Sequence, residues 1–170
     1  MLNKETFTKN QIVAATIKLL KEKDHTQISI SEIIKLSKVS RASFYRSFKS
    51  IEDVLAYQDK KLIKEYTMNY EIKNDTGYEI LFYEISKFYK KNKSFYIVVV
   101  NQGLSKIIID SLFINIDKLA SENKNLNAYA KTFLSFGIYG TIVTWIKNGM
   151  KESPESIYKY LKDYRTKYNI

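Results

Sequence analysis

Residues 29–55 read SISEIIKLSKVSRASFYRSFKSIEDVL, a run in which two short apolar segments lie on either side of a polar turn. Each segment follows a serine that can cap a helix. Ser29 precedes Glu32 by three residues, which is the spacing of a capping box, and Ser40 opens the second segment. Because helices of about eight residues are unstable alone, the two must share a core, which predicts a helix-turn-helix over about 29–48. The expected core residues are Ile30, Ile33, Val39, Phe44 and Phe48.

The second short helix keeps one face that the core does not use. Small hydroxyl and methyl side chains, two arginines and a tyrosine lie on it. Arginine can donate two hydrogen bonds to guanine, and small side chains allow close approach, so this face suits a DNA major groove. The alternative is that Tyr45 is a half-buried core aromatic and that the arginines are solvated surface charges. The residues predicted to contact DNA are Ser29, Ser31, Lys38, Ser40, Arg41, Ala42, Ser43, Tyr45, Arg46 and Lys49.

Four short motifs in this region resemble the TetR family of bacterial transcriptional regulators, and the likeness extends over about residues 8–65. The motifs are Ser29-Ile30-Ser31-Glu32-Ile33, Val39-Ser40-Arg41, Phe44-Tyr45-x-x-Phe48-Lys49-Ser50 and Glu52-Asp53-Val54-Leu55. The resemblance implies a homodimer that binds a palindromic operator in double-stranded DNA, and a helical C-terminal domain in which a ligand changes the spacing of the two DNA-binding units. It also implies that Tyr45 and Lys49 touch phosphates, whereas Ser40 to Ser43 and Arg46 lie nearest the bases.

The chain departs from the family pattern at three positions. Lys38 and Asp24 stand where members usually have glycine, and Ile51 stands where lysine is common. Lysine tolerates a positive φ poorly, so we expect a slightly different turn at Lys38, with an added phosphate contact from its side chain. We expect Ile51 to remove one contact.

The charge of the chain is concentrated at its N-terminus. The 170 residues carry 28 Lys and Arg against 18 Asp and Glu, a net charge of +10. Ten of the basic residues and only four of the acidic ones lie within residues 1–50. This balance favours a polyanionic partner such as nucleic acid, and a solvated lysine-rich surface is the alternative. With no Cys and one His, thiolate and multi-histidine metal sites are excluded, and no motif indicates a cofactor or an enzyme.

The rest of the chain predicts an all-α protein of about nine helices, because 5 Gly and 1 Pro are too few for an all-β fold. Thr8 with Gln11 is expected to cap the first helix. The predicted parts are a helix-turn-helix domain at 1–50, a connecting helix at 51–70 and a helical effector-binding and dimerisation domain at 75–170. The longest uncharged stretch has 15 residues, short of the roughly 20 that span a membrane, so we expect a cytoplasmic protein with no membrane partner.

Two sites are expected in the C-terminal domain. An apolar or aromatic effector would be lined by Tyr78, Phe82, Phe95, Gln102, Leu104, Ile108, Leu112 and Trp145, although each is also compatible with plain core packing. Small residues at helical spacing predict close approach of a second copy, through Phe133, Gly137, Gly140, Thr141 and Thr144.

These features favour a DNA-binding regulator, most simply a ligand-responsive repressor in which the connecting helix acts as the lever between the domains. An activator remains an alternative within the same class. A helical small-molecule or membrane-associated binding protein without DNA function is the alternative from another class.

Overall fold

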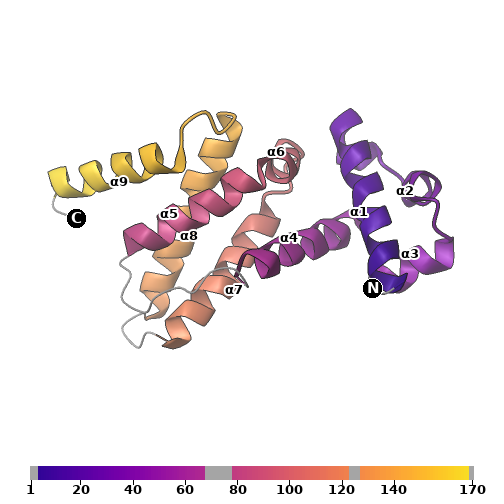
Figure 1. The fold of residues 1–170 in the computed structure, drawn as a ribbon, viewed down its shortest axis with the longest axis horizontal. Helices are drawn as coiled ribbons and strands as arrows, with labels where there is room; N and C mark the ends of the chain where they lie inside the picture. The colour runs from indigo at the N-terminus through magenta and orange to yellow at the C-terminus, as the bar shows by residue number, and fades with distance from the viewer. Residues whose placement is uncertain (1–3, 68–77, 123–126, 169–170) are drawn as a thin grey trace.

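The computed structural model describes residues 4–67, 78–122 and 127–168, with the side chains of 67, 78–80 and 117–122 outside the description. The described residues form nine α-helices and one short 3-10 helix and contain no strand, which confirms the all-α prediction (Figure 1). The helices are α1 (Lys4–Glu22), α2 (Ile30–Ser37), α3 (Arg41–Ser47), α4 (Ile51–Thr67), α5 (Tyr78–Lys91), α6 (Lys93–Asn101), α7 (Lys106–Glu122), α8 (Ala128–Lys147) and α9 (Pro154–Tyr168). None of the helices in these described ranges combines the length and the apolar composition that a membrane crossing requires.

The first three helices form a small unit around a core of their own (Figure 1). Ile33 of α2 and Phe44 of α3 are completely buried, and Phe48 at the end of α3 is 4% exposed. The rings of Phe44 and Phe48 lie 6.2 Å apart between centroids. Helix α1 closes this core with Ile12, which is also fully buried. The predicted helix-turn-helix core is therefore present, with Ile30 and Val39 packed at its edge.

Side-chain caps begin the two short helices as predicted. The Ser29 hydroxyl accepts from the backbone N–H of Glu32, and the Glu32 carboxylate accepts from the backbone N–H of Ser29. The Ser40 hydroxyl accepts from the N–H of Ser43 at 3.1 Å. The cap predicted at Thr8 is wrong, because α1 begins at Lys4 and the Thr8 hydroxyl donates to a carbonyl within that helix. Helices this short depend on such caps, since a larger share of their backbone groups is at the ends.

Helix α4 links the N-terminal unit to the rest of the chain, as Figure 1 shows. Its first turns bury Val54 and Leu55 completely beside α1, and its later turns contact α7. The Ser50 hydroxyl accepts from the N–H of Asp53 and so caps the start of α4. The connecting helix was expected over 51–70, of which 68–70 lie outside the described residues. One rigid element thus contributes to the core at both of its ends.

Helices α5 to α9 form the C-terminal part of the molecule (Figure 1). Helix α6 is short and apolar, and most of its side chains are buried between α1, α5 and α8. Helix α9 packs along α5, where the Tyr83 hydroxyl donates to the Glu155 carboxylate at 2.9 Å. The far end of α9 projects from the body of the molecule and is exposed from Leu161 to Tyr168.

Candidate nucleic-acid interface

Helix α3 presents a cationic outer surface above a buried aromatic side chain. Phe44 is fully buried, whereas its neighbour Tyr45 is 48% exposed and packs edge-on against the Phe44 ring. Arg41 and Arg46 are exposed on the same helix. The rigid core beneath the helix therefore holds these three side chains at the surface.

Arg41 and Tyr45 form a pair on this surface. The Arg41 guanidinium carbon lies 5.5 Å from the centre of the Tyr45 ring, which is within the range of a cation–π interaction. Stacking of this kind limits the rotamers of the arginine and leaves its N–H groups available at the edges. A guanidinium held in this way loses less conformational entropy when it binds.

Small side chains surround the start of α3. Ala42 is exposed, and the hydroxyls of Ser40 and Ser43 lie 2.8 Å apart. The side chains of Ser40, Ala42 and Ser43 are all small. The backbone of α3 can therefore approach a partner surface closely.

Two carboxylates of the N-terminal unit, Glu5 on α1 and Glu32 on α2, have lowered pKa values. The hydrogen bond and charge of Lys9 lower the pKa of Glu5, and the charge of Arg46 contributes to the same shift. Glu5 therefore offsets part of the positive charge at Arg46. A hydrogen bond from Lys23, with further bonds from Ser29, lowers the pKa of Glu32 to about 2, so this carboxylate stays ionised in its cap.

The turn between α2 and α3 adopts a left-handed conformation at Lys38, with φ 56° and ψ 32°. This is the region that glycine favours, so the altered turn expected from a lysine is not seen at this residue. Lys38 is exposed beside α3. The second expected glycine position behaves differently, because Asp24 has φ −60° and its carboxylate accepts from the N–H of Thr26.

The remaining predicted DNA contacts lie around this surface. Ser29 and Ser31 are exposed at the start of α2, although the Ser29 hydroxyl is already engaged with Glu32. Lys49 is exposed between α3 and α4, and its backbone N–H donates to Asp53. The structure thus brings the predicted set together on the α2–α3 side of the N-terminal unit.

The residues predicted to line an effector pocket are mostly buried. Phe82, Phe95, Ile108, Leu112 and Trp145 are each at most 7% exposed, and Leu104 is partly buried beside them. Phe95 lines a cleft beside α1, whereas Trp145 lines a separate groove between α8 and α9. The side chain of Tyr78 lies outside the described residues.

Gln102 connects the two parts of the chain. Its amide nitrogen donates to the carbonyls of Leu20 and Lys23 at 2.7 and 3.1 Å, and its amide oxygen accepts from the N–H of His25 at 2.7 Å. The backbone groups that Gln102 contacts lie at the end of α1 and at the start of the segment that follows it. This amide, which was predicted to line an effector pocket, therefore joins the N-terminal unit to the α6–α7 turn.

Helix α8 exposes the face that was predicted to meet a second copy. Phe133 is 80% exposed, and Gly137, Gly140 and Thr144 are also exposed. Thr141 is partly buried, and its hydroxyl donates to the carbonyl of Gly137. A Cβ added at either glycine would have no atom within 4 Å, so their small size is not needed by packing within the chain.

A buried carboxylate on α4 was missed by the sequence reasoning. Asp59 is completely buried and accepts hydrogen bonds from the hydroxyls of Tyr96 and Ser111. Burial raises its pKa despite these two bonds. The sequence contains a pattern that predicts this burial, because Asp59 lies four residues after the buried Leu55 and therefore on the same inner face of the helix. Among the described residues, no group of three or more His, Cys, Asp and Glu gathers as a metal site would require.

Two family models match the chain. The family described as "Bacterial regulatory proteins, tetR family" matches residues 12–57, and the one described as "Transcriptional regulator C-terminal region" matches residues 78–167. The first match includes the α1–α3 unit and the start of α4, and the second includes α5 to α9. Both halves of the structure thus fall within families of transcriptional regulators.

The similar proteins agree with these matches. An uncharacterized HTH-type transcriptional regulator, YxbF of Bacillus subtilis strain 168, is 27% identical over 163 residues, which cover 86% of this chain and 42% of that protein. The chain therefore spans less than half the length of this curated relative. The dihydroxyacetone kinase operon activator DhaS matches with a TM-score of 0.58 and 18% identity, over 92% of this chain and 93% of its own. A putative TetR-family regulator from Syntrophomonas wolfei matches with a TM-score of 0.59 and 17% identity, over 94% and 93%. At such identities the two structures show the fold.

Proposed function

This chain belongs to the TetR family of bacterial transcriptional regulators, whose members bind DNA, and we propose that it acts as a homodimeric, ligand-responsive repressor of a palindromic operator. The observation that carries the proposal is the exposed surface of α3, where Arg41, Tyr45 and Arg46 stand above the buried Phe44. A regulator that reads a major groove needs a short helix with this combination of rigid support and cationic surface.

In this proposal α3 enters the major groove. Arg41 and Arg46 reach base edges, while Tyr45, Lys49 and Lys38 hold the phosphates on either side. The small residues Ala42 and Ser43 allow the helix to lie deep in the groove. The net charge of +10 adds a sequence-independent attraction that weakens as salt rises.

The dimer would form through α8 and α9. Phe133 and the exposed side of α8 around Gly137 and Gly140 offer an apolar surface that a second copy can bury. Such a contact is isologous, so the two α3 helices are related by a twofold axis. A palindromic operator has the same symmetry, and its two half-sites would bind the two copies at once.

An effector in the C-terminal domain would act through α4. This helix buries Val54 and Leu55 in the N-terminal core and Asp59 beside α6 and α7. Any rearrangement at the second end therefore moves the first, which changes the separation of the two α3 helices. Coupling energies in such systems are typically about 1–3 kcal/mol, enough to release an operator at moderate ligand concentrations.

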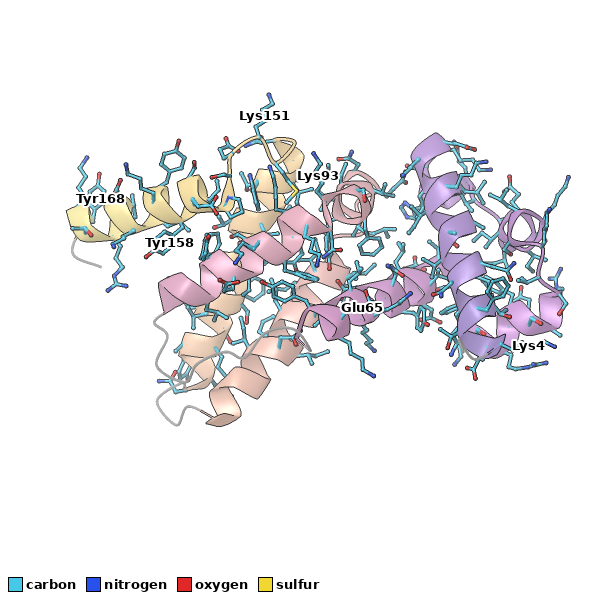
Figure 2. All side chains as sticks on the ribbon, viewed as in Figure 1. Lys4, Glu65, Lys93, Lys151, Tyr158 and Tyr168 are labelled. Atoms are coloured by element: carbon cyan, nitrogen blue, oxygen red, sulfur yellow. The ribbon has the colours of Figure 1, made fainter. Side chains whose placement is uncertain are left out.

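The test is a DNA-binding measurement by fluorescence anisotropy across a salt series. The duplexes are the DNA upstream of the gene itself, a duplex selected from random sequences by the wild-type protein, and a scrambled control. We expect the wild type to prefer a specific duplex about 10³-fold, and Arg41→Ala and Tyr45→Ala each to weaken that binding about tenfold or more. Lys151→Ala removes an exposed charge far from α3 (Figure 2) and is the matched control, with affinity close to wild type.

Two results would overturn the proposal. One is equal, weak binding of the wild type to all three duplexes, which would mean that α3 does not recognise a specific DNA sequence. The other is specific binding that neither α3 variant weakens. A reporter gene placed downstream of the bound DNA distinguishes repression from activation. A repressor lowers expression of the reporter, and an activator raises it.

A further inference from the structure

A cleft of about 210 Å³ lies where α1, α4 and the α5–α6 turn meet. It is separate from the α3 surface, since α1 begins beside α3 and its other end lies toward α6 (Figure 1). Its walls come from both parts of the chain. The residues that line it are Ile17, Lys21, Gln58, Leu62, Lys91, Asn92, Ser94 and Phe95.

Two lysines face this cleft from opposite parts of the molecule. Lys21 belongs to α1 and Lys91 to the end of α5, and both are exposed. Neither forms an ion pair with any residue in the described ranges. Lys23 and Lys87, which lie close to them in sequence, are both paired with glutamates. The cleft therefore concentrates positive charge that the described part of the chain does not neutralise.

Hydrogen-bond donors border the same space. Gln58 and Ser94 line it with side chains that have no hydrogen-bond partner within the described part of the chain. The Asn92 side chain donates to the carbonyl of Phe88, so it does not cap the start of α6. The N-terminus of α6, which has no side-chain cap, adds the positive end of a helix dipole that favours negative charge. The floor is apolar, formed by Ile17, Leu62 and Phe95.

We propose that this cleft binds a small anion, namely a phosphate or carboxylate group, between Lys21 and Lys91. Its volume of about 210 Å³ is below the roughly 300–1,000 Å³ of pockets that enclose whole drug-sized ligands, so it fits one anionic group. Each lysine would donate a charge-assisted hydrogen bond, and Gln58 and Ser94 would complete the shell. Of the residues expected to line an effector pocket, only Phe95 lines this cleft.

Occupancy of the cleft would hold the N-terminal unit against the C-terminal domain. Without an anion, two like charges border the junction, and a bound anion would weaken their repulsion. The bound form therefore favours the arrangement in which α1 lies close to the α5–α6 turn. This step rests on the proposed function, because it matters to operator binding only if the chain is a regulator.

Direct binding is measured first, by isothermal titration calorimetry at constant ionic strength. Inorganic phosphate and acetate are the two probes, and chloride is the reference. We expect saturable binding that the double variant Lys21→Gln/Lys91→Gln weakens at least tenfold, because it removes both charge-assisted hydrogen bonds. The matched control is Lys18→Gln/Lys93→Gln, which removes the same charge from α1 and α6 outside the cleft.

The two probes separate the chemical sources. If the cleft binds phosphate more tightly than acetate, its natural ligand carries a phosphate group. If it binds acetate more tightly, its natural ligand carries a carboxylate group. The proposal is overturned if neither probe binds saturably, or if the control variant loses as much affinity as the cleft variant. Thermal unfolding of all variants verifies that they remain folded, so loss of binding reports the cleft alone.

Operator binding is then measured with and without the preferred anion, again at constant ionic strength. We expect the anion to change the operator affinity of the wild type at least threefold and that of the cleft variant not at all. An unchanged wild-type affinity would overturn the coupling step. If no duplex is bound specifically, the proposed function fails, while the calorimetry still decides whether the cleft is an anion site.

Discussion

The outer surfaces of α3 and α8 expose opposite kinds of chemistry. On α3 the exposed groups are Arg41, Arg46 and the half-exposed Tyr45, which are compatible with water as well as with a polyanion. On α8 the large exposed side chains are aromatic, namely Tyr129, Phe133 and Phe136, at 87%, 80% and 55% exposure. Apolar area of that kind is unfavourable in water and favours burial against another apolar surface. We therefore expect the first surface to bind a charged partner and the second to pack against another protein surface.

The largest expected effect is on dimerisation, when a side chain is added at Gly140. Gly140→Leu meets no atom within the chain at its Cβ, so the monomer accommodates it, but a second copy could no longer approach α8 closely. We expect the dimer dissociation constant to rise about 100-fold, which is a typical loss at the centre of an interface. Analytical ultracentrifugation measures it, and affinity for a palindromic operator falls with it.

Lys93→Leu is the matched control for this variant, because it adds an exposed leucine to α6 instead of α8. It is expected to dimerise like the wild type. Unchanged dimerisation of Gly140→Leu would show that the apolar surface of α8 has another partner, and the contrast with α3 would then need a different explanation.

A smaller effect is expected at the junction between the two regions. Gln102→Ala removes all three hydrogen bonds that join the α6–α7 turn to the end of α1. Hydrogen exchange should quicken at residues 20–27, and the free energy of unfolding should fall by about 1–3 kcal/mol because buried groups lose their partners. Asn101→Ala, at the exposed neighbouring position, is the control.

Gln102→Glu sharpens the same test. A carboxylate still accepts from the N–H of His25 but cannot donate to the carbonyls of Leu20 and Lys23. We expect a loss at least as large as that of the alanine variant. Wild-type exchange rates in both variants would mean that the two regions are joined chiefly by α4.

Asp59 gives a pH-dependent prediction for the middle of α4. Burial raises its pKa above 3.8 in the folded chain, so the folded state binds this proton more tightly than the unfolded state. Its contribution to the free energy of unfolding is therefore complete below pH 3.8 and is lost as pH rises through the raised pKa. Asp59→Asn cannot titrate, so the stability of the wild type relative to this variant should decline as pH rises.

Urea unfolding of both proteins from about pH 3 to about pH 8 measures that difference. Subtracting the two curves removes the opposite trend of Glu32, whose lowered pKa of about 2 makes it lose stability as pH falls. Parallel curves would mean that Asp59 is solvated in the folded protein. Glu32, which is exposed to solvent in its cap, provides the comparison within the same chain.

The two regions also differ in how far the sequence predicts them. The caps at Ser29 and Ser40 act within three residues, so their geometry follows from local spacing. The contacts of Gln102 join residues 77 to 82 positions apart, and no local pattern contains them. Thr8 was predicted wrongly because its spacing to Gln11 is that of a cap, although the helix already begins at Lys4.

For Asp59, too, the sequence predicts only part of what the structure shows. Its position on the inner face of α4 is readable from the spacing to Leu55, but its partners Tyr96 and Ser111 come from α6 and α7. The sequence therefore predicts the burial of such a group and not what satisfies it. The same holds for the cleft lysines, because only the fold brings Lys21 and Lys91 to one space.

The smallest expected effect tests the turn that supports α3. Lys38 has φ 56°, a conformation that costs about 1–2 kcal/mol for a residue with a side chain and little for glycine. Lys38→Gly should therefore raise the free energy of unfolding by about 1 kcal/mol after the extra chain entropy of glycine is included. Denaturant unfolding measures the change.

Lys38→Ala separates this strain from the loss of charge. Alanine removes the same cation but keeps a Cβ in the left-handed conformation, so it should not share the gain in stability. Both variants should lose the same small amount of DNA affinity if Lys38 contacts a phosphate, with a shallower salt dependence in each. Equal stability of the two variants would contradict a strained turn. A gain in stability with no loss of DNA affinity would mean that Lys38 contributes only to the conformation of the turn and that the charge of the α3 surface comes from its arginines.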